Sequence, residues 1–283
     1  MAIFTNQATL RYNNITRNSN IATGEIVQAL TLSKEAISDE YFPTDDITYA
    51  LSVVNTGVSE LTNLTLVDNL GAYMLGTNTL YPLTYKDGSL KYYVNGVLQP
   101  TPATTTSPAL TITGITLPAG ANAMFIYETT ANEFAPISLG SSITNTASLQ
   151  SSGTTPAITA SETVTVRAVS DLTISKSVSP SVINENGLLT YTLVIQNTGN
   201  AATSGNATVT DTFLPRLENV VVTYNGEEWT EGINYTYNEL TGEFATLDGQ
   251  ISVDGAVFVQ DSVTGEITST PGVAVITVTG NVV

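Results

Sequence analysis

The sequence predicts an all-β protein, with two tandem immunoglobulin-like β-sandwiches preceded by an N-terminal donor β-hairpin. Its composition is rich in Thr, Val, Ile, Leu, Asn and Gly, which are typical of strands and tight turns. No window carries an apolar stripe at helical spacing, and Gly or Pro interrupts nearly every apolar run. The same landmarks also recur in order in two parts of the 283-residue chain, a length that suggests about two domains.

Residues 1–29 are predicted to form the hairpin. Its first strand consists of Phe4, Thr5, Asn6, Gln7, Ala8, Thr9 and Leu10. A similar segment returns as residues 143–149, and in both places a turn and a second strand follow (21–28 and 160–167). No third copy follows the second sandwich. The chain therefore opens with the closing hairpin of a module whose body is absent, and its second sandwich lacks such a hairpin.

The two sandwiches are predicted to span residues 30–168 (module one) and residues 169–283 (module two). Each contains, in the same order, a first strand with a lysine, an Asn-Thr-Gly turn, a strand that ends in aspartate, and an Asn-Gly turn. These landmarks are Lys34, Asn55, Asp68 and Asn95 in module one, and Lys176, Asn197, Asp211 and Asn225 in module two. An Asn-Gly turn favours positive φ at both central positions and predicts a tight β-hairpin.

The composition excludes several classes of function. The chain has no Cys and no His, so thiol and imidazole catalysis and the usual zinc ligands are absent. A net charge of -17 with only eight Lys and Arg residues disfavours nucleic acid and anionic lipid as partners. We see neither a secretory signal nor an apolar run that would insert into a membrane.

One acidic loop leaves two alternatives open for a metal. Asp39, Glu40, Asp45 and Asp46 either hold calcium through carboxylate oxygens or form a solvated turn. Their spacing matches no defined calcium loop. We expect no metal and no cofactor.

Six polar residues share the strand face of apolar neighbours and are predicted to point into the core. Strand residues of one parity lie on one face, and Lys34, for example, has the parity of Leu30 and Leu32. The six are Lys34, Lys176, Asp68, Asp211, Asn145 and Asn6.

Burial disfavours the charged forms of Lys and Asp, and a neutral amine is a nucleophile toward a carboxamide that a protonated acid polarises. We therefore predict an intramolecular isopeptide bond between Lys34 and Asn145, with Asp68 as the acid. A second bond is expected between Lys176 and Asn6 of the next subunit, with Asp211 as the acid. The alternative is a buried, non-covalent Lys–Asp pair whose remaining hydrogen bonds the Asn satisfies.

The segments 171–176, 189–199, 209–212 and 143–148 together resemble the "conserved repeat" module of prokaryotic surface proteins, a β-sandwich catalogued as a domain of unknown function. The resemblance implies an extracellular stalk or envelope protein. The chain order Lys, acid, Asn also resembles the isopeptide-bearing domains of Gram-positive pilins and adhesins. This sequence departs from the family because a closing hairpin comes first.

A sandwich without its last strands exposes core and unpaired strand edges, which favours pairing with another chain. We predict that the hairpin of one subunit completes module two of the next, giving a head-to-tail filament of identical subunits at an extracellular, cell or spore surface. Without a visible signal, we expect assembly in a cell that later lyses. The alternatives are a hairpin packed on its own module one, a domain-swapped dimer, and a monomeric adhesin or ligand-binding stalk. A conventional enzyme fits least.

Overall fold

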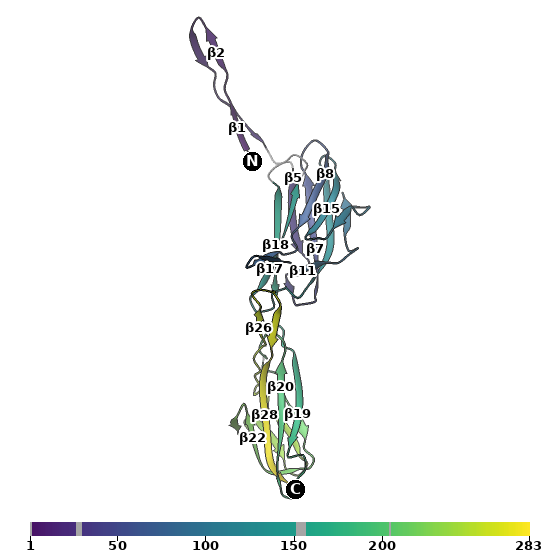
Figure 1. Ribbon diagram of the computed structural model, residues 1–283, viewed down its shortest axis with the longest axis vertical. Helices are drawn as coiled ribbons and strands as arrows, with labels where there is room; N and C mark the ends of the chain where they lie inside the picture. The colour runs from purple at the N-terminus through teal and green to yellow at the C-terminus, as the bar shows by residue number, and fades with distance from the viewer. Residues whose placement is uncertain (1, 27–29, 151–156, 204) are drawn as a thin grey trace.

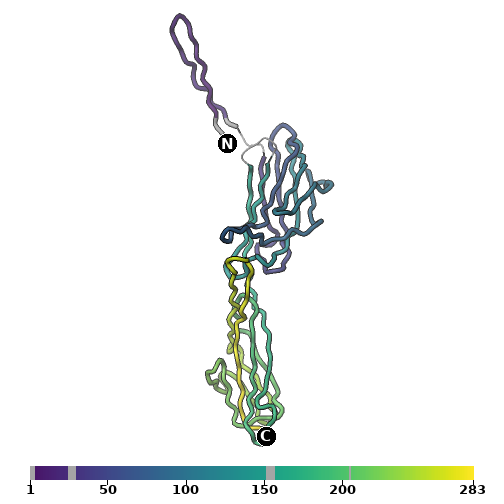
Figure 2. Tube along the Cα trace, viewed as in Figure 1, coloured from purple at the N-terminus to yellow at the C-terminus, as the bar shows by residue number. Residues whose placement is uncertain are grey.

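The protein is elongated, with the hairpin at one end, module one in the middle and module two at the other end (Figure 1; Figure 2). The computed structural model describes residues 2–26, 30–150, 157–203 and 205–283. Within these ranges every regular element is a strand and none is a helix, so the predicted all-β class is confirmed.

The N-terminal hairpin projects away from module one as a two-stranded ribbon (Figure 1). It pairs β1 with β4 and β2 with β3, and the strands are β1 (Ala2–Asn6), β2 (Thr9–Tyr12), β3 (Ile15–Asn18) and β4 (Ala22–Ile26). Asn13 and Asn14 close it with φ of 46° and 58°, as a two-residue type I′ turn requires. The predicted hairpin therefore forms, although residues 27–29 at its predicted end lie outside the described residues.

Module one is a sandwich of two six-stranded sheets. The first has the order β13-β12-β16-β7-β5 with β11 also beside β16, and contains β5 (Leu30–Ala36), β7 (Asp46–Asn55), β11 (Leu83–Tyr85), β12 (Lys91–Val94), β13 (Val97–Gln99) and β16 (Asn122–Ala131). The second has the order β14-β15-β8-β17-β18-β6, and contains β6 (Glu40–Tyr41), β8 (Leu61–Asp68), β14 (Ala103–Thr105), β15 (Leu110–Leu117), β17 (Ser142–Gln150) and β18 (Ile158–Val166).

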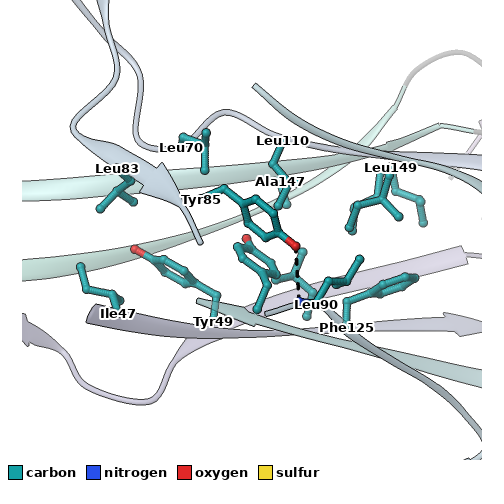
Figure 3. Close-up of a cluster of buried hydrophobic side chains, with 14 of the residues drawn as sticks. Ile47, Tyr49, Leu70, Leu83, Tyr85, Leu90, Leu110, Phe125, Ala147 and Leu149 are labelled. Carbon is teal, nitrogen blue, oxygen red and sulfur yellow. Dashed lines mark hydrogen bonds between the residues drawn. The ribbon is translucent and has the colours of Figure 1, made fainter. Parts of the chain in front are cut away.

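The core of module one lies between these sheets (Figure 3). Along β7 every second side chain is buried, including Tyr49 and Leu51, as expected for a strand with one face toward a core. Side chains of the second sheet, such as Ala147 and Leu149, face them from across the sandwich.

Module two repeats this plan with fewer strands. Its five-stranded sheet has the order β19-β20-β28-β22-β23, with β19 (Leu172–Ser179), β20 (Leu188–Asn197), β22 (Leu217–Tyr224), β23 (Glu227–Trp229) and β28 (Gly272–Val282). Its second sheet has three strands in the order β21-β25-β24, with β21 (Thr210–Thr212), β24 (Tyr235–Asn238) and β25 (Glu243–Thr246).

The strand orders of the two modules correspond. The order β19-β20-β28-β22-β23 matches β5-β7-β16-β12-β13, and β21-β25-β24 matches β8-β15-β14. The predicted Asn-Gly turns also correspond, since Asn95, Gly96, Asn225 and Gly226 all have positive φ. The described part of module two has no counterpart of β17 and β18 in this order.

Each module also carries one hairpin that the described residues of the other lack, and the sequence did not predict either. They are β9 (Tyr73–Leu75) with β10 (Asn78–Leu80) in module one, and β26 (Val257–Gln260) with β27 (Ile267–Thr270) in module two. These two hairpins meet between the modules, where Gln260 Nε2 donates to the Tyr73 hydroxyl (2.6 Å) and Asn78 Nδ2 to the Val263 carbonyl (3.2 Å).

The Asn-Thr-Gly turn of module two also holds the link between the modules. Asn197 is fully buried, and its Oδ1 accepts from the backbone of Gly199 and of Asp171, both at 3.0 Å. A Cβ on Gly199 would lie 2.2 Å from the Val169 carbonyl oxygen, so only glycine lets the link pass this close. The motif therefore fixes the start of module two against the end of module one.

Candidate functional site

Lys34 and Asp68 form a buried ion pair inside module one. Lys34 comes from β5 in the first sheet and Asp68 from the end of β8 in the second, so the pair bridges the sandwich. Both side chains are almost fully shielded from solvent, with exposed fractions of 0% and 1%. Lys34 Nζ and the Tyr127 hydroxyl both donate to Asp68 Oδ2, and the Leu70 amide donates to Oδ1 at 2.9 Å.

Asn145 is fully buried on β17, the strand beside β8 in the same sheet as Asp68. Its Oδ1 accepts from the Gly71 backbone amide (3.2 Å), and this N–H draws electron density from the side-chain carbonyl. Among the described residues, Asn145 Nδ2 and the Tyr49 hydroxyl are the buried side-chain atoms without a hydrogen-bond partner. The carboxamide therefore has a polarised carbonyl and an amide nitrogen that nothing holds, as suits an acyl acceptor.

The ionisable groups around the pair respond to burial. Burial lowers the pKa of the Lys34 ammonium below its ordinary 10.5, while Asp68 and then Glu162 act in the opposite direction. Burial, and next the charge of Asp68, raise the pKa of Tyr49 and of Tyr127. The Asn145 side chain opposes this rise in pKa at both tyrosines.

Module two holds the corresponding pair in a more open setting. Lys176 Nζ lies 2.5 Å from Asp211 Oδ2, but the exposed fractions of the two side chains are 39% and 19%. Lys176 lies 4.5 Å from the centre of the Tyr191 ring, as Lys34 does from that of Tyr49. The two sites therefore share their lysine, acid and aromatic ring and differ in what covers them.

In module one the cover is the β17–β18 hairpin. Strand β17 pairs with β8 in the register Ala147–Asp68 and Leu149–Leu66, while β15 occupies the other side of β8. In module two, β21 pairs with β25 on one side, and no described strand pairs with the other.

The first strand of module two shows the same lack of cover. All eight residues of β19 are exposed, whereas alternate residues of β5 are partly or fully buried. Leu172, Ile174 and Val178 keep exposed fractions of 38%, 55% and 42%. Among the described residues, module two thus leaves uncovered the edge of β21 and the strand β19, whose counterparts in module one lie beside β17 and β18; we call this uncovered region the slot.

The N-terminal hairpin has a sequence similar to that of β17, and among the described residues its strands pair only with one another. Phe4 and Leu10 are 53% and 65% exposed, and Asn6 is exposed on β1 opposite Ala22. The hydrogen bonds described for the hairpin link its own strands. Module one lies between this hairpin and module two (Figure 1).

The structure therefore brings together some of the predicted site residues and separates others. Lys34 meets Asp68, Lys176 meets Asp211, and Asn145 lies beside Asp68 on the neighbouring strand. Lys34 and Asn145 come from opposite sheets, and β1, which carries Asn6, is separated by module one from β19, which carries Lys176 (Figure 1).

Sequence reasoning missed three residues of the module-one site, Tyr49, Tyr127 and Glu162. Tyr127 shares strand parity with the buried Phe125, and Glu162 shares it with the buried Val164. Parity alone therefore indicated inward side chains, while their proximity to Lys34 depended on strand packing.

The other candidate sites of the sequence lie on the surface. Asp45 pairs with Arg167 at 3.2 Å and Asp46 with Lys86 at 2.6 Å. Over the described ranges no three acidic side chains gather in a way that would hold a metal ion. No described helix is long and apolar enough to cross a membrane.

No family model and no curated protein matches the chain. Among solved structures, it is similar to BcpA, the major pilin subunit of Bacillus cereus, at 12% identity and a TM-score of 0.40, over 96% of this chain and 73% of that one. The pilus backbone RrgB of Streptococcus pneumoniae has 11% identity and a TM-score of 0.35, over 86% and 55%. The collagen-binding domain of a Staphylococcus aureus adhesin has 15% identity and a TM-score of 0.30, over 47% and 96%.

Proposed function

We propose that the protein is the structural subunit of a filament that grows when the N-terminal hairpin of one copy enters module two of the next. The open edge of β21 carries this proposal, because the corresponding edge of β8 is occupied by β17. An unpaired strand edge beside exposed apolar side chains is a template for strand addition.

The hairpin fits the slot by register and by chemistry. With β17 as the guide, Ala8 lies opposite Asp211 and Leu10 opposite Val209, while Phe4 takes the place of Ile143. Burial of a side chain such as Phe or Leu stabilises by roughly 1.5–3 kcal/mol, and the β21 backbone gains its missing hydrogen bonds.

The arrangement of the subunit favours an open polymer. The hairpin and module two lie on opposite sides of module one, which favours a contact between copies over a contact within one chain (Figure 1). A contact between two different surfaces repeats from copy to copy and builds a filament unless the rotation closes a ring. Such a filament serves as an appendage at a cell or spore surface and needs no cofactor.

Isopeptide bonds reinforce the filament in this proposal. Asp211 takes a proton from the Lys176 ammonium, and the neutral Nζ attacks Asn6 Cγ of the incoming hairpin. An Nζ–Cγ amide bond forms and the Cγ–Nδ2 bond breaks. Asp211 returns its proton to Nδ2, which leaves as ammonia, and Asp211 takes up the second proton that Nζ loses as it becomes the amide nitrogen. Lys34, Asp68 and Asn145 carry out the same exchange within module one.

Denaturing electrophoresis after boiling, together with intact mass, tests this function on wild type and on Asn6→Ala. We expect a boiling-resistant ladder in wild type and only monomer in Asn6→Ala. That monomer should still lack one ammonia, from the bond between Lys34 and Asn145. Gln7→Ala is the control, because it removes the neighbouring carboxamide, which donates to the Ser19 carbonyl within the hairpin and is not the proposed acceptor, and it should leave the ladder intact.

The alternative function, a monomeric surface adhesin or stalk, predicts a different outcome. A slot that is filled within one chain would give monomers at every concentration and no fibres in negative stain, whether or not the bond between Lys34 and Asn145 has formed. Fibres that dissolve on boiling would retain the hairpin exchange and remove the covalent part of the proposal.

A further inference from the structure

Glu162 lies on β18 directly across the hairpin from Asn145. It is half-buried on the inward row of this strand, between the exposed Ser161 and Thr163. A carboxylate therefore enters the module-one site from the strand that covers it.

This carboxylate acts on Lys34. Strand β18 packs beside β5, which carries Lys34, and the negative charge of Glu162 favours the lysine ammonium. The Tyr127 hydroxyl donates to Asp68 Oδ2 and so favours the carboxylate form of the acid. Both groups hold Lys34 and Asp68 as an ion pair and oppose the amine and acid forms that attack on Asn145 requires.

The site between subunits has neither group. In the N-terminal hairpin, the residue across from Asn6 is Ala22, at the register position that Glu162 has across from Asn145. Tyr127 pairs with Tyr49 on β7, whereas the residue that pairs with the corresponding Tyr191 on β20 is Val278. The incoming hairpin would thus bring Ala22 to the Lys176–Asp211 pair at the position where module one brings Glu162 to the Lys34–Asp68 pair.

We propose that Glu162 is a positioning residue that slows the bond inside module one, so that the bond between subunits forms first. This inference rests on the proposed function. Lys34 must pass a proton to Asp68 before its Nζ attacks Asn145 Cγ and ammonia leaves, and Glu162 opposes that transfer without entering the bond changes. The bond between Lys176 and Asn6 at a newly formed joint is therefore complete before the bond between Lys34 and Asn145 inside module one.

The module-one arm measures ammonia loss by intact mass at intervals after cell-free synthesis, in the Asn6→Ala background where Lys34–Asn145 is the remaining site. Glu162→Gln should speed the loss of ammonia, because it removes a negative charge that favours the Lys34 ammonium over the neutral amine. Glu162→Asp retains the negative charge, so ammonia loss should be nearly as slow as with Glu162. Glu35→Gln is the matched control, because Glu35 follows Lys34 on β5 but is exposed, and it should leave the rate unchanged.

The second experiment tests the bond between subunits by adding a carboxylate to the N-terminal hairpin at position 22. In the Asn145→Ala background, Ala22→Glu should slow growth of the boiling-resistant ladder relative to Ala22→Gln, which has the same size without the charge. Because Ala22 is exposed in the free chain, neither change disturbs the folded modules.

The two arms separate this inference from the function beneath it. Equal rates with Glu162 and with Glu162→Gln, with both bonds still forming, would overturn the role of Glu162 and leave the filament and its cross-links in place. Bonds that never form in any variant would overturn the cross-linking and the role of Glu162 together.

Discussion

Single tyrosines in module one make its stability depend on alkaline pH. Burial raises the pKa of Tyr41, Tyr49 and Tyr127 above the ordinary 10.0. Above this pH the unfolded chain loses protons that the folded chain keeps, so the free energy of unfolding should fall by about 1 kcal/mol per pH unit for each tyrosine. Lys34 has the opposite effect, and only below pH 10.5. There its lowered pKa leaves the extra proton on the unfolded chain, so the free energy of unfolding rises with pH.

Urea unfolding between about pH 9 and pH 11 measures this slope. Circular dichroism follows the whole chain, and fluorescence of Trp229, the single tryptophan, separates the transition of module two. Tyr49→Phe should reduce the slope without loss of stability at neutral pH, since its buried hydroxyl has no partner. Tyr12→Phe, at an exposed position, should leave the slope unchanged. An unchanged slope in Tyr49→Phe would contradict the prediction.

The same residues mark how far sequence reasoning reaches at this scale. Strand alternation predicted that six polar side chains point into a core. The structure buries Lys34, Asp68 and Asn145, but leaves Asp211 19% and Lys176 39% exposed and Asn6 exposed on the free hairpin. Alternation could not predict that Tyr127 binds Asp68 or that Glu162 approaches Lys34. Those contacts cross between sheets, and alternation fixes the face of a residue but not its neighbours on the other sheet.

At the level of strands, the inward row of the hairpin should decide whether copies assemble. Phe4→Asp and Leu10→Asp each place a carboxylate where the slot offers no compensating partner, and burial of such a charge costs several kcal/mol. We expect both variants to remain monomeric in analytical ultracentrifugation, with binding weakened more than 100-fold, about 3 kcal/mol at a factor of ten per 1.4 kcal/mol.

The outward row provides the matched controls for this prediction. Thr5→Asp and Thr9→Asp add the same charge to the same strands on the face that solvent keeps. Both variants should still polymerise. Filaments of wild-type length in Phe4→Asp would show that the hairpin does not enter module two in the proposed register.

Repeated landmarks predicted the paired strands but not the added ones. The Lys, Asn-Thr-Gly and Asn-Gly landmarks located strands in both modules, because each had a partner to compare with. The β9–β10 and β26–β27 hairpins have no such partner, and strands of only three or four residues are too short for alternation to separate them from loops. Their contact between the modules could not be predicted from the sequence, because it depends on how the two modules pack against each other.

Across the whole molecule, these two added hairpins make the internal junction unlike the proposed junction between copies. Inside the chain, Asn200 adds to the hydrogen bonds between the two modules, because its Nδ2 donates to the carbonyls of Ile137 (2.9 Å) and Arg167 (3.1 Å). At the joint between copies, the end of module two passes from β21 to β22 without a counterpart of β9–β10. Module one offers only the short turn from β15 to β16 where module two has β26–β27.

We therefore predict that filaments bend at every second junction. Electron micrographs should show straight two-module segments joined at compliant points, with a wider distribution of bend angles between subunits than within them. Asn200→Ala with Gln260→Ala should widen the internal distribution, because it removes the hydrogen bonds that hold module two to Tyr73, Ile137 and Arg167. Gln99→Ala removes a carboxamide that donates to the Val97 carbonyl within module one, and it should leave the internal distribution of bend angles unchanged. Equal bending at both kinds of junction in wild type would mean that the added hairpins do not stiffen the subunit.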